Sequence, residues 1–455
     1  MSPRAAAPGT KPQKNTRIFE RIFVDTAGID AGSNEHWVAV PADRDEEPVR
    51  RFGTTTRELN DLARWLLTCR VRRVAVEATG VYCEPLLAVL ERHGIETKLV
   101  KPSSLKAVNE YQKTDMQDCQ WIQLLETFGL LRAAFRPAPE ISQIRVVVRE
   151  RRDLIEQATQ NINKMHKALT AMNVRLDLAV TDITGKTGLR IISAILGGQR
   201  DPINLAELRD KRCQRSVAEI ADALNGEYDD GHLLVLRNAV EMFKACRGLV
   251  ELCDTRLEQL VRALEPKASI ADVPAPRRKE HVRKNVFKFE AREAFFSVLG
   301  TDLTQIDGIS TSTVGTFIAE VGTDVDAWQT EKHFCSWLRL SPGSNKTGGK
   351  QRSSRNAPTA NRLTTALHVA AQTLTNSNSA LGAFYRRMRA RMGPDQAIKA
   401  AAHRLAQQIY FCVKYRRQYV DPGPQYYEVK NRERAIATLS KRARALGLTL
   451  VEAAA

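Results

Sequence analysis

The first part of the chain alternates short apolar runs with amphipathic stretches. Apolar runs bounded by glycine and polar residues predict strands at residues 21–29, 35–40, 48–54, 73–78 and 96–101. Apolar positions that recur every three or four residues predict helices at residues 56–69, 84–93, 104–111 and 114–128. This order is that of a ribonuclease-H-like layer, in which an antiparallel edge is followed by a parallel half. No GxGxxG follows the first strand, which disfavours a Rossmann unit.

Further along the chain the apolar period changes to alternating steps of three and four residues. The first series comprises Ile141, Ile144, Val148, Arg151, Ile155, Ala158, Ile162, Met165, Leu169 and Met172. The second comprises Leu236, Val240, Phe243, Val250, Cys253, Leu257, Leu260 and Leu264. Two such helices predict an antiparallel coiled-coil hairpin, interrupted by a glycine-containing insertion around residues 185–231. Its expected role is spacing and dimerisation, and Arg151 in the seam suggests register control or an interchain ion pair.

A linker rich in proline and charge, ADVPAPRRKEHVRKN at residues 271–285, separates this region from a last domain that is predicted to be helical. That domain opens with the turn Ile306-Asp307-Gly308-Ile309 and a helix at residues 311–321. The turn resembles a helix-hairpin-helix element, which can present backbone N–H groups to phosphate. The expected divisions are a flexible basic arm (1–20), an α/β domain (21–135), a coiled-coil middle region with the linker (136–290), an all-α domain (291–430) and a C-terminal helix or tail (431–455).

The net charge of the chain indicates what kind of partner it binds. Lys and Arg number 69 against 52 Asp and Glu, which gives a net charge of +17 and points to a polyanion, with nucleic acid as the first candidate. The eight cysteines form no CxxC pair, which argues against a zinc site and fits a reducing compartment. No apolar run reaches the roughly 18 residues that span a bilayer. We therefore expect a soluble, cytoplasmic and nucleoid-associated protein without a membrane partner.

Four carboxylates stand out by their placement. Asp30 and Glu77 lie near the ends of the first and fourth predicted strands, while Asp115 and Asp118 open the helix after the last strand and share one face of it. Thr114 and Gln117 would form a capping box that fixes the start of this helix. Any single carboxylate at a strand end is more often a cap or turn residue. Together the four predict a Mg²⁺ site, because Mg²⁺ prefers hard oxygen ligands and can stabilise an in-line phosphoryl displacement.

A second group of residues is basic. Between Glu331 and Asp395 there is no acidic residue. The stretch carries Lys332, Arg339, Lys346, Lys350, Arg352, Arg355, Arg362, Arg386, Arg387, Arg389 and Arg391. Within it, the sequence LSPGSNKTGGK at residues 340–350 predicts a flexible phosphate-binding loop.

The ordered series GIDAG, VEATG, KTDMQD, a coiled-coil middle, IDGIS, LSPGSNKTGGK and NRLTTALHVAA resembles one family of insertion-sequence transposases over nearly the whole chain. These recombinases have an Asp-Glu-Asp-Asp, RuvC-like domain and a separate C-terminal transposase domain, and some are guided by a bridge RNA. The resemblance implies that Asp30, Glu77, Asp115 and Asp118 bind Mg²⁺. It also implies that a hydroxyl of the C-terminal domain attacks DNA and forms a covalent link, and that donor DNA, target DNA and a guide RNA are the partners.

The family's nucleophile is a serine that precedes a glycine shortly after a Leu-x-Pro element, and here that position is Thr347. A threonine hydroxyl can act as a nucleophile, but its methyl group restricts χ1 and crowds an in-line attack. Three interpretations stay open: Thr347 is the nucleophile, Ser344 replaces it, or the copy is impaired. Ser353 and Ser354 are further candidates.

The leading hypothesis is a Mg²⁺-dependent DNA transposase or recombinase with a composite site, assembled between protomers of a homo-oligomer through the coiled coil. The residues expected to contact nucleic acid are Lys113, Lys346, Lys350, Arg352, Arg355, Arg386 and Arg387. The first alternative is a hydrolytic nuclease or Holliday-junction resolvase, in which water attacks and Thr347 only binds phosphate. The second is a non-catalytic nucleic-acid-binding protein. A covalent protein–DNA adduct distinguishes the first hypothesis from both alternatives.

Overall fold

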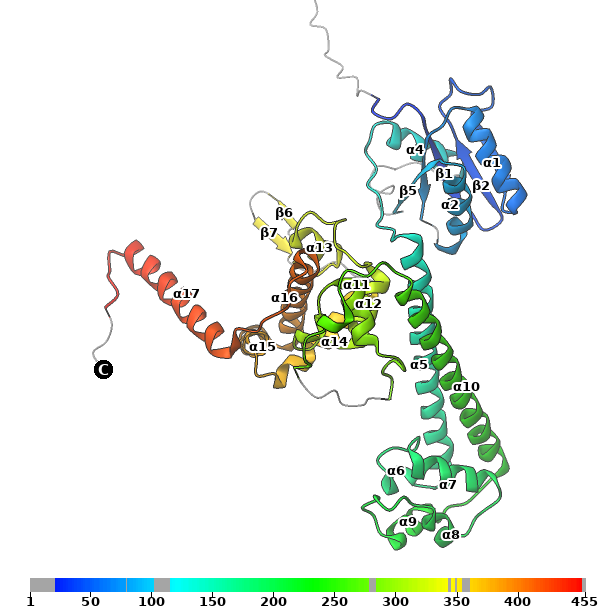
Figure 1. Cartoon of the computed structure of the whole chain (residues 1–455), viewed down its shortest axis with the longest axis vertical. Coiled ribbons are helices and arrows are strands. Elements are labelled where there is room, and N and C mark those ends of the chain that lie inside the picture. Colours follow the sequence, from blue (N-terminus) through cyan, green and yellow to red (C-terminus); the bar gives the residue numbers. More distant parts are fainter. Residues whose placement is uncertain are drawn as a thin grey trace, which may run out of the picture. The chain divides into compact units, whose positions relative to one another are not determined.

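The computed structural model describes residues 21–78, 80–101, 115–277, 284–342, 345–347, 350–353 and 361–451, with the backbone alone at 345–347 and 350–353. The chain divides into two compact units, Met1–Arg136 and Pro137–Ala455 (Figure 1). The expected basic arm at residues 1–20 and the expected helix at residues 104–111 lie outside the described residues.

The first unit is built on one mixed sheet. Its strands are β1 (Thr26–Ala31), β2 (Glu35–Ala39), β3 (Val49–Gly53), β4 (Arg73–Glu77) and β5 (Glu96–Val100). They lie in the order β3-β2-β1-β4-β5, with β3, β2 and β1 antiparallel and β1, β4 and β5 parallel. This arrangement is compatible with the expected ribonuclease-H-like layer. The first strand begins at Thr26, later than expected, and ends at Ala31, so Asp30 lies inside the strand.

The two faces of the sheet are covered by different helices. Ala27, Ile29 and Ala31 alternate along β1 and share one core with the apolar sides of α1 (Thr56–Thr68) and α2 (Cys83–Arg92). The opposite face packs against α4 (Asp115–Thr127), whose buried apolar residues share a second core with the sheet. The members of this second core are Ala75, Val100, Ile122, Leu125 and Leu131. Alternation with period two therefore decides which strand residues meet α4.

The second unit begins with a two-helix hairpin formed by α5 (Pro139–Ala171) and α10 (Asp230–Arg262), which pack along each other (Figure 1). They are antiparallel, because Arg151 pairs with Asp254 whereas Met165 shares a core with Leu236. Between them lie α6 (Leu176–Ala179), α7 (Lys186–Leu196), α8 (Pro202–Glu207) and α9 (Val217–Leu224). These short helices share one apolar core with the adjoining ends of α5 and α10.

The buried seam of the hairpin differs in part from the expected one. Leu154 is buried where Ile155 was expected, and Asp254 and Val261 are buried where Cys253 and Leu260 were expected. A straight α-helix has 3.6 residues per turn and drifts against a strict 3.5 repeat, so a single heptad frame cannot describe helices of this length.

Arg151 occupies the hairpin seam but pairs within the chain, so the interchain pair considered for it is wrong. Its Nε and Nη2 donate to Asp254 Oδ1 at 2.5 Å and Oδ2 at 3.3 Å, and both side chains are almost fully buried. Nη2 also donates to the carbonyl oxygens of Asn285 and Val286, and the guanidinium lies 4.3 Å from the centroid of the Phe287 ring. The pair therefore fastens both helices to the segment that leads into the C-terminal helices.

The remainder of the second unit is mostly helical. Its helices are α11 (Ala291–Leu299), α12 (Thr311–Glu320), α13 (Glu331–Trp337), α14 (Arg362–Thr373), α15 (Ala380–Met392), α16 (Pro394–Tyr415) and α17 (Gly423–Ala445). Short 3₁₀ turns lie at Gly80–Tyr82 in the first unit and at Ile270–Asp272, Leu303–Gln305 and Leu374–Asn376 in the second. The expected boundary at residue 430 falls inside α17.

The expectation of an all-α domain is wrong at one place. An antiparallel β-hairpin, β6 (Asn345–Thr347) and β7 (Lys350–Ser353), stands in the stretch expected to be a flexible loop. Thr347 pairs with Lys350, and the sequence between them is Gly-Gly, a dipeptide typical of two-residue hairpin turns. In the part of the chain that the structure describes, no helix is both long and apolar enough to cross a membrane, and all eight cysteines are free.

The Arg151–Asp254 pair should carry a large share of the stability of the second unit. We expect Arg151→Ala to lower the free energy of unfolding by about 3–5 kcal/mol, because it leaves the Asp254 carboxylate buried without its partner. Arg152→Ala is the matched control, since the neighbouring Arg152 pairs with Glu156 on an exposed surface and should cost less than about 1 kcal/mol. Urea unfolding followed by circular dichroism measures both, and equal losses would contradict the prediction.

Candidate functional site

Two of the expected ligands lie side by side at one end of the sheet. Ile29 of β1 pairs with Val76 of β4 in parallel register, so the next residues, Asp30 and Glu77, occupy neighbouring positions. Glu77 lies two residues after Ala75, so both point to the same face of the sheet, and Asp30 is in register with Glu77. Ala75 belongs to the core beneath α4. Asp30 and Glu77 are both half-buried. Asp30 and Glu77 therefore belong to the sheet face that α4 covers.

Helix α4 lies directly on β1 at Gly28. A Cβ atom at this glycine would lie 2.3 Å from Cys119 O and 2.3 Å from Gln123 N, which no side chain tolerates. Cys119 therefore lies above Gly28, which is two residues before Asp30 in β1. Asp118 is the residue before Cys119 in the first turn of α4. The sequence analysis did not single out Gly28, although a glycine inside a strand often marks such a close approach.

The pKa of the Cys119 thiol is raised by its surroundings. The thiol is fully buried and donates to Met116 O at 3.1 Å. Burial in the first place, and the negative charges of Asp30 and Asp118 in addition, raise the pKa of this thiol to about 12.

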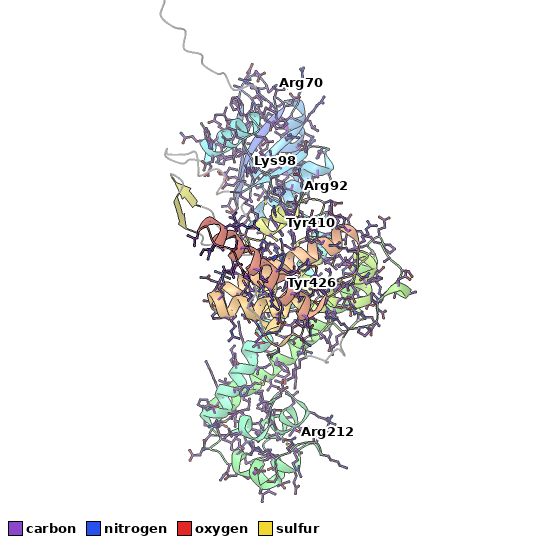
Figure 2. All side chains as sticks on the ribbon, turned by 90° about the vertical axis from the view of Figure 1, so that its left-hand side faces the viewer. Arg70, Arg92, Lys98, Arg212, Tyr410 and Tyr426 are labelled. Carbon is purple, nitrogen blue, oxygen red and sulfur yellow. The ribbon has the colours of Figure 1, made fainter. Side chains whose placement is uncertain are left out.

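The far end of α4 is fixed by an ion cluster. Glu126 is fully buried, and its two carboxylate oxygens accept from Lys98 Nζ at 3.0 and 2.8 Å (Lys98 is labelled in Figure 2). Arg73 lies 3.7 Å from the same carboxylate. Because Arg73 belongs to β4 and Lys98 to β5, Glu126 holds α4 across the parallel half of the sheet. The sequence analysis missed this acid, whose position among the apolar residues of α4 was the available signal.

The other expected ligands are placed less fully. Asp115 is exposed at the first position of α4, one turn before the half-buried Asp118. Lys113 and the expected N-cap Thr114 lie outside the described residues. Among the residues that the structure describes, no group of three or more His, Cys, Asp or Glu side chains could by itself hold a metal ion. The donor chemistry nevertheless fits Mg²⁺, which proteins usually bind through one or two carboxylates completed by phosphate oxygens and water.

The expected nucleophile and its basic neighbours belong to the second unit. Thr347 ends β6, Ser353 ends β7, and the same hairpin carries Lys346, Lys350 and Arg352. Ser344, Ser354 and Arg355 lie outside the described residues. The hairpin therefore concentrates three basic residues around the backbone position of the threonine.

Two features expected to contact phosphate also make contacts within their own unit. Arg386 Nη1 donates to the carbonyl oxygens of Thr375 at 3.3 Å and Ser377 at 2.7 Å, so Arg386 holds a turn of its own domain, whereas Arg387 is exposed. In the turn before α12, Gly308 has φ +89°, and a Cβ there would lie 2.7 Å from Ala370 O. Packing against α14 therefore accounts for this glycine without any phosphate.

Comparison with known proteins completes this description. A model described as a transposase, of the Asp-Glu-Asp-Asp type found in IS110 elements, matches residues 27–174. A second model, described as the transposase IS116/IS110/IS902 family, matches residues 300–386. An uncharacterised 44.8 kDa protein of insertion element IS116 from Streptomyces clavuligerus is 30% identical over 171 residues, which cover 35% of this chain and 41% of that protein.

Two matches in different parts of the chain lead to the same class of protein, the transposases of insertion sequences. The chain belongs to the IS116/IS110/IS902 family. The first match contains Asp30, Glu77, Asp115 and Asp118, and the second contains Thr347. The chain spans less than half the length of the curated relative that it matches.

The close approach at Gly28 gives a prediction about the site's support. Gly28→Ala should destabilise the first unit by about 1–3 kcal/mol, because the added methyl group overpacks the contact between β1 and α4. Gly248→Ala is the control, since nothing lies within 4 Å of its Cβ position and alanine favours the helix by about 1 kcal/mol. Thermal unfolding measures both variants. A Gly28→Ala protein as stable as the unchanged chain would show that the helix does not rest on the strand.

Proposed function

We propose that this chain is a transposase that cuts and rejoins DNA strands in a divalent-metal-dependent reaction. The observation that supports the proposal is that Asp30 and Glu77 occupy neighbouring positions at the end of β1 and β4, on the sheet face packed against α4, the helix whose first turn carries Asp118. Hard oxygen donors at a half-exposed edge suit a metal that also binds phosphate. Family membership and the net charge of +17 both support DNA as the substrate.

The proposed roles of the acids follow from their positions. Asp30, Glu77 and Asp118 would hold Mg²⁺, with Asp115 one helical turn away as a further ligand. Mg²⁺ bound there would supply charge stabilisation at the scissile phosphate. Glu126, Lys98 and Arg73 would position the ligands by fixing α4 on the sheet.

The proposed nucleophile is the hydroxyl of Thr347. Its oxygen would attack phosphorus and give up its proton, the bond from phosphorus to the leaving DNA oxygen would break, and the leaving oxygen would take up a proton in exchange. A phosphothreonine link to the strand results, and reversal of the step with a second strand end completes the exchange. Lys346, Lys350 and Arg352 on the same hairpin would balance the charge that develops on phosphorus.

We further propose that the site is composite, because the acids belong to the first unit and Thr347 to the second. Assembly of the two parts between protomers of a homo-oligomer, with a guide RNA selecting donor and target DNA, is the form that the family resemblance suggests. The alternative of a hydrolytic nuclease keeps the same acids and replaces the threonine hydroxyl by water. The alternative of a non-catalytic binder keeps only the basic surface.

The acids can be tested by a conservative substitution. Asp118→Asn should reduce Mg²⁺-dependent strand cleavage at least about a hundredfold, because losing several kcal/mol of transition-state stabilisation costs a factor of ten per 1.36 kcal/mol. Asp61→Asn is the control, since Asp61 is an exposed acid of α1 paired with Arg64. Cleavage of a labelled duplex, with the guide RNA supplied, measures both. Undiminished cleavage by Asp118→Asn would remove the acids from the mechanism.

The nucleophile can be tested by trapping the adduct. With Mg²⁺ present, Thr347→Ala should abolish a denaturation-resistant protein–DNA adduct, whereas Thr347→Ser should increase it, because serine lacks the methyl group that restricts χ1. Ser344→Ala is the control and should leave the adduct unchanged. Cleavage that needs Asp118 but is indifferent to Thr347 and yields no adduct would identify a hydrolytic nuclease instead.

A further inference from the structure

Helix α17, the last described helix of the chain, contributes little to the core of its own unit. None of the described side chains of α17 is buried, although the helix is 23 residues long and contacts α15 (Figure 1). A helix of this kind gains little from the core of its own domain. Both family models end before it, at residues 174 and 386, so nothing assigns it a role.

The charge of α17 and α15 is strongly one-sided. Together the two helices carry ten Lys and Arg residues against two Glu residues, a net charge of +8 out of the +17 of the whole chain. The basic residues are Arg386, Arg387, Arg389, Arg391, Lys430, Arg432, Arg434, Lys441, Arg442 and Arg444. Apart from Arg386, which holds the turn described above, none of them forms an ion pair or hydrogen bond with a carboxylate or carbonyl among the described residues.

Four of the six basic residues of α17 lie on one face of the helix. Lys430, Arg434, Lys441 and Arg444 follow steps of four, seven and three residues, which places them on one face. At a rise of about 1.5 Å per residue this basic stripe is about 21 Å long. Lys430 Nζ lies 4.6 Å from the centroid of the Tyr426 ring, which is labelled in Figure 2.

We propose that the basic stripe of α17 is a binding surface for the sugar-phosphate backbone of a nucleic acid. Duplex DNA carries one negative charge per 1.7 Å of its axis, so a stripe of about 21 Å can meet several phosphates at once. Unpaired, exposed and regularly spaced cations release counterions from a polyanion and give affinity without sequence preference. The proposal rests on the proposed function only for the presence of nucleic acid.

An apolar stripe on the same helix could instead be covered by another protein surface. Val429, Ile436 and Leu439 are each about half exposed and lie away from the basic stripe. A second copy of the chain could cover them. The charge favours nucleic acid, because two copies of a helix with this excess of positive charge repel each other.

The experiment measures affinity for a labelled 30-base-pair DNA duplex, and for an RNA duplex of equal length, across a salt series in the presence of EDTA. The test variant replaces Lys430, Arg434, Lys441 and Arg444 by Gln together. The matched control replaces four exposed basic residues elsewhere in the second unit, Lys164, Lys167, Lys211 and Arg212, by Gln. Circular dichroism checks that each variant keeps its helix content.

We expect the test variant to bind at least tenfold more weakly near physiological salt, with a slope of log affinity against log salt that is shallower by about 2–4, while the control keeps the wild-type slope. The probe that loses more affinity identifies the nucleic acid. Wild-type affinity in the test variant, or an equal loss in the control, overturns the proposal.

A third variant, in which Val429, Ile436 and Leu439 are replaced by Gln, tests the rival occupant. If this variant alone loses DNA affinity and sediments as a smaller species, α17 is a self-association helix and the proposal is wrong. A protein that never cleaves DNA but binds it through α17 would refute the proposed function and leave this inference intact.

Discussion

The candidate site depends on one steric constraint, the contact of the α4 backbone with β1 across Gly28. Because no Cβ separates them, the carbonyl of Cys119 and the amide of Gln123 come within van der Waals reach of the strand. This contact sets the height of α4 above the sheet and thereby the distance from Asp118 to Asp30. The buried Glu126, held by Lys98 and Arg73, fixes the other end of the same helix. Two attachments, one steric and one ionic, orient the helix that carries the expected ligands.

The second unit depends on a constraint of another kind. Arg151 and Asp254 lose most of their hydration when the hairpin forms, and the cost is offset only if every donor finds an acceptor. The backbone carbonyls of Asn285 and Val286 accept further hydrogen bonds from Arg151 Nη2, and so the pair also fixes the start of the C-terminal helices. Arg145 and Arg149 extend the attachment by binding the end of α12 at Ala319 and Glu320. The hairpin root and the C-terminal helices are therefore joined by polar contacts as well as by apolar packing.

The basic residues of this chain differ in whether they pair with groups of their own unit. Arg73, Arg151 and Arg386 are occupied by partners of their own unit, and their charge supports the fold. The six basic residues of α17 form no ion pair or hydrogen bond with a carboxylate or carbonyl among the described residues. The excess of positive charge that the composition reveals is therefore unevenly available to a polyanion, and only the contacts distinguish structural arginines from those free to bind.

The sequence by itself determined which segments form the five strands of the first unit, the long helical hairpin and the family. Period-two and three-to-four apolar patterns and ordered motifs are local properties of the chain. The sequence also placed Asp30, Glu77 and Asp118 at strand and helix ends. Tertiary structure alone decided what depends on residues distant in sequence. Gly28 matters because it contacts a helix some ninety positions later, Arg151 pairs with Asp254, and Glu126 is buried because Lys98 and Arg73 of two strands surround its carboxylate. Within the stretch expected to be a flexible loop, Asn345–Thr347 pair with Lys350–Ser353, because this pairing satisfies backbone groups that composition suggested would stay in solvent. Local pattern fixes which elements form, whereas burial and partner choice are decided only when those elements meet.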